Sequence, residues 1–147
     1  MVRVLAVPLV AITLVACSSD EGASGTTAEE TRNLAVVEGF FRGLVTNKDP
    51  LEVGRYLRDD FVSNEPMIAG KQGMMDFATF QAKNNPNANF VDVIHTVAKG
   101  DLVIKHYTFA NDPAKGADFL IVDFLRLEDG LIVEYWDVVK TPLRVGG

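Results

Sequence analysis

The sequence has only one cysteine and two histidines among its 147 residues, and it is poor in cations. A single cysteine excludes an intrachain disulfide, and therefore a disulfide-stapled miniprotein. Lysine and arginine number 14 against 20 acidic residues, which gives a net charge of −6. Because contacts to a phosphate backbone require cations, this deficit argues against nucleic acid as a partner. The sequence also lacks a glycine-rich phosphate loop, a Gly-x-Ser-x-Gly elbow and a spacing of ligands typical of a metal site. We therefore expect no cofactor and no metal.

The remaining composition is that of an ordinary globular chain, with 48% hydrophobic residues. Its length suits one domain with a core of its own.

The first sixteen residues have the pattern of an export signal. Arg3 precedes an almost unbroken apolar run over residues 4–16. As a helix this run covers about 20 Å at ~1.5 Å per residue, less than the ~30 Å hydrocarbon core of a bilayer. It is therefore typical of a signal peptide rather than of a membrane span.

The end of that run, Leu14-Val15-Ala16-Cys17, resembles the lipobox of bacterial lipoprotein precursors. The resemblance implies removal of residues 1–16, lipidation of Cys17 and a location on the outer side of a cell membrane. Two or more acyl chains suffice for stable anchoring. The alternative is a plain secretory signal with an incidental cysteine.

Residues 17–27 are small, polar or acidic and predict a flexible tether. A folded domain is expected over residues 28–143. It begins with a capping box, in which Thr27 and Glu30 each satisfy a backbone N–H of the other.

The domain pattern changes from helical to strand-like near residue 89. The 3.6-residue spacing predicts a first helix from residue 28 to the 47–50 segment, a second over 51–58 and a third over 71–83, with an extended stretch at 61–66. Alternation then predicts four strands, over residues 90–97, 102–109, 118–127 and 131–140. The last two flank Asp129-Gly130, a strong hairpin turn signal. Three helices followed by a four-stranded antiparallel meander define an α+β domain.

Asp123 is the most prominent candidate for chemistry because it interrupts the apolar run 119–125. Burial disfavours its charged form and raises its pKa, which would make it a competent base near neutral pH. The alternative is a structural aspartate satisfied by backbone donors.

Two further residues on neighbouring strands fit such a site. His106 would lie within reach of Asp123 on the preceding antiparallel strand, and Tyr135 could donate to a developing oxyanion. His95 is interpreted as structural. On the last strand Tyr135 and Asp137 share one face and Trp136 the other. The pattern leaves open which face lines a pocket.

The segment 123–137 (DFLRLEDGLIVEYWD) closely resembles the final hairpin of SnoaL-like polyketide cyclases. That family belongs to the nuclear-transport-factor-2-like superfamily and shares its fold with ketosteroid isomerase. The similarity extends over about residues 33–143. It implies a cone-shaped α+β barrel, with the three helices packed in a strongly curved antiparallel sheet around an apolar pocket.

The resemblance also implies a chemistry and its residues. In the cyclases an aspartate abstracts a proton α to a carbonyl; Asp123 matches it, and His106 matches a family histidine. Tyr135, Asn64 and Trp136 would then bind substrate. The chain departs from the family where an imidazole is missing before Asn64 and where Tyr135 replaces a histidine.

The sequence thus predicts a lipid-anchored, extracytoplasmic SnoaL-like domain that binds a small hydrophobic ligand and transfers protons in an aldol cyclisation or isomerisation. The alternatives are a non-catalytic ligand-binding module and an interaction module that forms a homodimer through the outer face of its sheet.

Overall fold

The computed structural model describes residues 25–141. The helices are α1 (Ala28–Phe41), α2 (Pro50–Gly54) and α3 (Gly70–Asn84), with a π-helix η1 (Arg42–Asn47) and a short 3-10 helix η2 (Pro113–Lys115). The strands are β1 (Leu57–Ser63), β2 (Asn89–Lys99), β3 (Leu102–Ala110), β4 (Phe119–Glu128) and β5 (Leu131–Lys140). The predicted signal peptide and Cys17 lie outside the described residues. Within residues 25–141, no helix is both long enough and apolar enough to cross a membrane.

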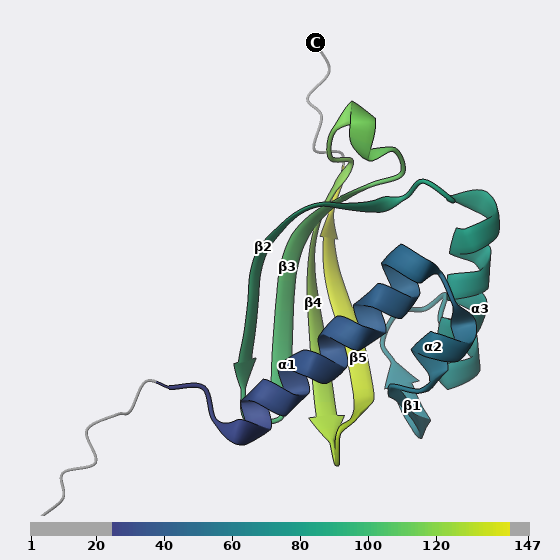
Figure 1. The fold of residues 1–147 in the computed structure, drawn as a ribbon. Coiled ribbons are helices and arrows are strands. Elements are labelled where there is room, and N and C mark those ends of the chain that lie inside the picture. The colour runs from purple at the N-terminus through teal and green to yellow at the C-terminus, as the bar shows by residue number, and fades with distance from the viewer. Residues whose placement is uncertain (1–24, 142–147) are drawn as a thin grey trace, which may run out of the picture.

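The five strands form one mixed sheet in the order β1-β5-β4-β3-β2 (Figure 1). Strands β2 to β5 are the predicted antiparallel meander, and β1 adds a fifth strand parallel to β5. The prediction of four strands is therefore wrong by one, whereas the α+β class is confirmed.

Strand β1 also corrects the prediction of a helix over residues 51–58. Helix α2 ends at Gly54, and the chain is already extended at Leu57. Leu57 and Phe61 are buried, and the backbone N–H of Ile132 donates to the carbonyl of Tyr56. Pairing with β5 and burial of these apolar side chains outweigh the local helical spacing, because propensity is a weak preference compared with tertiary packing.

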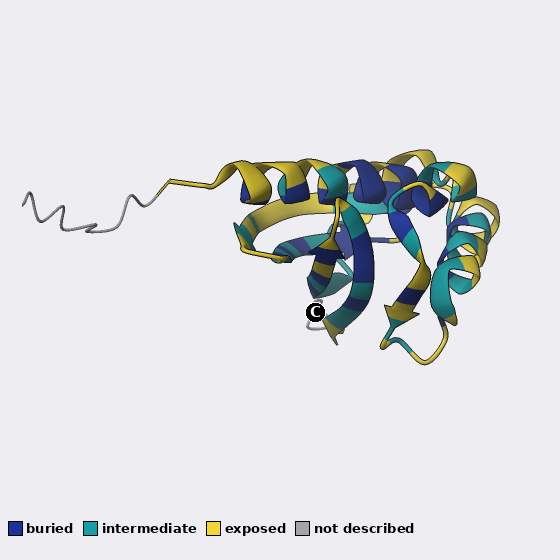
Figure 2. Ribbon diagram, turned by 90° about the horizontal axis from the view of Figure 1, so that it is seen from below, coloured by how far each residue is buried: buried dark blue, intermediate teal, exposed yellow. Residues whose placement is uncertain are grey.

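The sheet curves around α1, and α2 and α3 lie beside β1 (Figure 1). Buried residues gather on the side of α1 that faces the sheet and in bands along the strands (Figure 2). Val37, Phe40 and Phe41 of α1 are part of one core cluster with Val103 of β3 and Leu125 of β4. The core therefore fills the concave side of the sheet.

The start of α1 is fixed to the turn between β2 and β3. The predicted capping box is present: the N–H of Glu30 donates to the Thr27 hydroxyl, and the N–H of Thr27 donates to the Glu30 carboxylate. The same carboxylate accepts from the N–H of Gly100 at 3.0 Å. The Asn33 amide donates to the carbonyl of Gly100, also at 3.0 Å. These bonds set the direction in which α1 crosses the sheet.

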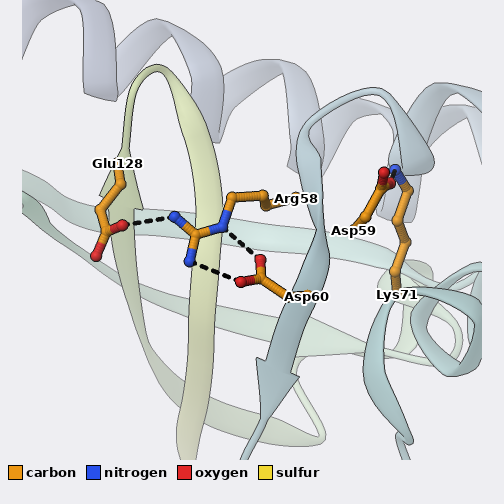
Figure 3. A network of polar contacts seen from close by, with 5 residues as sticks. All are labelled: Arg58, Asp59, Asp60, Lys71 and Glu128. Carbon is orange, nitrogen blue, oxygen red and sulfur yellow. Dashed lines mark hydrogen bonds and ion pairs between the residues drawn. The ribbon is translucent and has the colours of Figure 1, made fainter.

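Charged side chains lie on both sides of β1 (Figure 3). Arg58 lies between Asp60 and Glu128 and pairs with both, and Lys71 of α3 pairs with Asp59 at 2.8 Å. Exposed pairs of this kind contribute little individually. They do connect the edge strand to the end of β4 and to α3.

Candidate functional site

Strands β3, β4 and β5 place three charged residues in one row on the inner face of the sheet. Lys105 lies opposite Asp123, and Asp123 lies opposite Asp137. Cross-strand partners share a face of the sheet, so all three side chains start out toward the helices. Lys105 and Asp123 are buried and Asp137 is half-buried.

Asp123 lies at the centre of this row and is held by two phenols. Its side chain is 0% exposed. The Tyr107 hydroxyl donates to Oδ2 at 2.7 Å, and the Tyr135 hydroxyl donates to Oδ1 at 3.0 Å. Both tyrosines reach it because they lie two positions from Lys105 and Asp137 on the flanking strands, on the same face.

Burial dominates the electrostatics of this cluster. It raises the pKa of Asp123 to about 7, although the hydrogen bonds from Tyr107 and Tyr135 lower it. Burial and the neighbouring Asp123 carboxyl raise the pKa of both tyrosines well above the usual value. The phenols therefore keep their protons, and Asp123 changes charge near neutral pH.

Lys105 is next to Asp123 in the sheet but is bonded elsewhere. Its ammonium lies 3.2 Å from the carboxylate of Glu38 on α1, and 5.3 Å from the ring centroids of Phe41 and Phe90. This geometry provides cation–π stabilisation for a lysine that is almost fully buried. Asp123 is thus held by phenols rather than by a direct ion pair.

A pocket of about 110 Å³ lies in front of the two phenols. Its lining is mostly apolar and comes from α1, η1, α3 and three strands: Phe41, Leu44, Val45, Phe77, Gln81, Tyr107, Phe109, Ile121, Tyr135 and Asp137. Asp123 is not part of this lining because it lies behind the tyrosines. The pocket therefore presents two phenols and one carboxyl group.

Asp137 is the residue whose carboxyl group lines the pocket. Its Oδ2 lies 3.4 Å from the Tyr135 hydroxyl. Burial and the carboxyl group of Glu65, in the loop after β1, raise the pKa of Asp137 to about 7. Two carboxyl groups with pKa values near neutrality, linked through one tyrosine, can accept and return protons at physiological pH.

The π-helix η1 shapes the opposite wall of the pocket. Its wider turn follows α1 directly and places Leu44 and Val45 in the pocket lining. Lys48 ends it in a left-handed conformation, with φ of 50°. The Lys48 ammonium donates to the carbonyls of Val45 and Ala88, at 2.6 and 2.8 Å. Single π-turns of this type are frequent at functional sites.

The structure brings together two of the predicted site residues, Asp123 and Tyr135. It does not bring His106 to Asp123, and this prediction needs correction. His106 lies opposite Val122, and Asp123 lies opposite Lys105. Side chains alternate along a strand, so His106 is on the outer face, where its ring faces that of His95 at 6.2 Å.

Trp136 and Asn64 also lie away from the pocket. Trp136 is on the outer face and stacks on Phe124 with ring centroids 5.3 Å apart. The Asn64 amide donates to Glu134 at 3.0 Å. Asn64 therefore lies beside the middle of β5 and outside the pocket lining, contrary to the expectation that it binds substrate.

Two site residues were not identified from the sequence. The sequence pattern favoured the adjacent His106 over Tyr107, although Tyr107 shares a strand face with Lys105 and Phe109. Glu65, in the loop after β1, raises the pKa of Asp137 on the neighbouring strand β5. No local spacing in the sequence indicates that these two residues interact. Across residues 25–141, no group of three or more histidine, cysteine, aspartate or glutamate residues is placed to hold a metal ion.

The chain belongs to the SnoaL-like domain family, whose model matches residues 37–135. The fold and the family match agree with the resemblance seen in the final hairpin. A search of curated proteins finds no match.

Solved structures with the same fold come from several bacteria. An NTF2-like protein of unknown function from Mesorhizobium loti has a TM-score of 0.65 at 20% identity, over 79% of this chain and 97% of that one. TsrD from Streptomyces laurentii has a TM-score of 0.61 at 21% identity, over 74% and 88%. A putative polyketide cyclase from Bacillus cereus has a TM-score of 0.62 at 21% identity, over 74% of each chain. At these identities the similarity establishes the fold alone.

Proposed function

We propose that this SnoaL-like domain transfers protons at the carbon α to the carbonyl of a small, largely apolar molecule. The observation that carries the proposal is a small apolar pocket in which two phenols and a carboxyl with pKa near 7 converge. The class of reaction is isomerisation or aldol-type ring closure, both of which pass through an enolate.

Asp137 is the base in this proposal, because its carboxyl lines the pocket and Asp123 does not. The ionised Asp137 carboxylate takes the α-proton, and the electron pair of the broken C–H bond moves onto the carbonyl oxygen. The Tyr107 or Tyr135 hydroxyl donates a hydrogen bond to that oxygen. Return of the proton to a different carbon, or attack of the enolate on a second carbonyl, completes the reaction.

Asp123 controls whether the phenols are available as donors. While it is ionised, both hydroxyls donate to it. Once protonated, it can donate its own hydrogen to one phenol oxygen, which releases that phenol's hydrogen toward the pocket. A carboxylic acid kept neutral near pH 7 by an apolar site has this capacity.

The test uses a small ketone, because the pocket is equivalent in volume to only about three or four water molecules of ~30 Å³ each. We expect wild-type protein to accelerate exchange of the C3 hydrogens of 2-butanone for deuterium, followed by NMR in D₂O. Asp137→Asn should reduce the acceleration by about 10²-fold or more, the usual contribution of a general base. Asp92→Asn, on the exposed surface of β2, is the matched control.

The pH dependence follows from the two carboxyl groups. Exchange should rise as Asp137 loses its proton near pH 7 and fall again as Asp123 loses its own. The two groups interact through Tyr135, so the limbs report the pair rather than single residues. Binding of 2-butanone without any exchange at any pH would leave the alternative of a non-catalytic ligand carrier.

The outer face of the sheet supports a second proposal, a homodimer. The cross-strand row Val97, Ile104, Phe124 and Trp136 is apolar, and Val97 is 52% exposed. Sedimentation velocity should show a dimer that Val97→Lys dissociates. A monomer at all concentrations would refute it.

We also propose that Cys17 carries a lipid and holds the domain at the outer side of a bacterial membrane. The support is the segment Leu14-Val15-Ala16-Cys17 at the end of an apolar run. Metabolic labelling with a palmitate analogue should mark the full-length protein, and Cys17→Ser should abolish the label. Equal labelling of both would contradict the anchor.

A further inference from the structure

A second hollow, of about 410 Å³, lies along α3. We call it the α3 groove and define it by its lining: Met67, Ala69, Gly73, Asp76, Phe77 and Phe80. Met67 is 90% exposed and Phe80 is 51% exposed. Two large apolar side chains thus face solvent beside a hollow nearly four times the volume of the pocket.

The α3 groove and the pocket are neighbours that share Phe77, which is in the lining of both spaces. One helical turn later, Gln81 belongs to the pocket, and one turn earlier, Gly73 belongs to the groove. A molecule that extends along α3 past the Phe77 ring would therefore occupy both.

The size of the pocket requires such an extension for any ligand larger than a few heavy atoms. Pockets that enclose ordinary small ligands measure roughly 300–1,000 Å³. The pocket alone, at about 110 Å³, is far below this range, whereas the pocket and the groove together fall within it.

The charges in the two linings indicate the ligand's own charge. Asp137 is the one charged residue of the pocket lining, and Asp76 is the one charged residue of the groove lining. Neither lining contains lysine or arginine. An anionic ligand would meet two carboxyl groups without a counterion, which is unfavourable in a partly apolar site.

We propose that the substrate is an uncharged amphiphile, with its carbonyl in the pocket and an aliphatic tail in the α3 groove. This inference rests on the proposed proton-transfer function, since that function places the carbonyl. Fatty acids and acyl phosphates are excluded by their charge. Long-chain ketones and neutral esters fit.

A homologous series of ketones tests the tail site. Dissociation constants of 2-alkanones from 2-butanone to 2-decanone are measured by calorimetry on the wild-type domain. Full burial of a methylene is equivalent to about fourfold in affinity, so we expect two- to fourfold tighter binding for each added carbon until the groove is filled.

Surface variants show whether the tighter binding of longer 2-alkanones arises in the α3 groove. Met67→Ser and Phe80→Ser should flatten the dependence on chain length and leave 2-butanone binding unchanged. Leu51→Ser is the matched control, because Leu51 is 67% exposed on α2 and lines neither space. A chain-length effect that persists in both groove variants would overturn the proposed tail site.

The remaining outcomes separate this inference from the proposed function. If 2-butanone binds and longer ketones bind no tighter, the α3 groove is not a tail site and the pocket still functions. If no ketone binds, the proposed function fails together with the inference. Decanoate at pH 8 should bind at least tenfold more weakly than 2-decanone; equal or tighter binding would overturn the assignment of a neutral ligand.

Discussion

The two faces of the sheet carry different chemistry on adjacent residues of the same strands. The inner row contains Lys105, Asp123 and Asp137, and the outer row, one residue along each strand, contains His106, Val122 and Val138. On the inner face, burial raises the pKa of both aspartates to about 7. On the outer face, Val138 is exposed and His106 is half-buried. The face of the sheet toward which a strand position points, rather than its residue type, decides which polar groups belong to the site.

The largest expected effect comes from removing the buried inner charge. The pKa of Asp123 is higher in the folded state than in the unfolded chain, so the folded state binds the proton more tightly. The stabilisation of the folded state that results from this tighter proton binding is fully present below about pH 4 and is lost as the pH rises to about 7. At about 1.4 kcal/mol per pKa unit, the loss is of the order of 4 kcal/mol.

Asp123→Asn tests this value because the amide does not ionise. Urea unfolding from pH 4 to pH 8 should show the free energy of unfolding of wild type falling relative to the variant by that amount. The exposed Asp92→Asn on β2 provides the reference. A difference between wild type and Asp123→Asn that is constant with pH would contradict the burial of an ionisable group.

A pair of valines compares the two faces without any charge. Val103 on the inner face is 0% exposed, and Val97 faces outward. Val103→Ala removes two buried carbon atoms and should lower the free energy of unfolding by about 2 kcal/mol. Val97→Ala should change it by less than about 0.5 kcal/mol at concentrations at which the protein is monomeric, because Val97 is covered only in the proposed dimer. Equal losses in chemical denaturation at those concentrations would mean that the outer face is also covered within one chain.

Tyr135→Phe removes one of the two donors to Asp123 and should lower stability by about 1.5 kcal/mol. Its hydrogen bond lowers the pKa of Asp123, so the variant should also raise that pKa, as measured by NMR titration of the carboxyl carbon. Tyr56→Phe is the control, since the Tyr56 hydroxyl accepts a hydrogen bond from the exposed Arg42, at 3.4 Å, and not from a buried group. An unchanged pKa of Asp123 would show that the phenol is not a significant donor.

The smallest effect is expected on the outer face. His106→Gln should change the free energy of unfolding by less than about 0.5 kcal/mol and leave the deuterium exchange of 2-butanone unchanged. A loss of exchange activity comparable to that of Asp137→Asn would show that His106, on the outer face, takes part in the reaction.

Much of the fold could be predicted from local patterns. The capping box at Thr27, the helix of residues 71–83 and the Asp129-Gly130 turn all depend on contacts within a few residues. The burial of Asp123 followed from its apolar neighbours on both faces. The second half of strand β1 falls in the predicted extended stretch 61–66, but its place in the sheet could not be predicted, because its pairing partner β5 lies about 70 residues away in the sequence.

The site depended on a feature that local patterns do not reveal. The register of β4 and β5 shifts between Arg126 and Leu127. Counting back from the Asp129-Gly130 turn without this shift would place Trp136 opposite Asp123 and on the inner face. The irregularity places Asp137 there instead, and with it the carboxyl that lines the pocket. One extra residue in β5 therefore places the carboxyl group of Asp137, instead of the indole of Trp136, in the site.

Helix α1 separates the point where the chain enters the domain from the pocket. Its 14 residues span about 21 Å, from a start bonded to Gly100 to an end at Phe41, which lines the pocket. Whatever precedes Gly25 thus joins the domain at the end of α1 remote from the pocket lining. An affinity tag, a fusion partner or a solid support coupled at the N-terminal side is therefore attached far from the pocket, so immobilised and free protein should bind 2-alkanones with the same Kd.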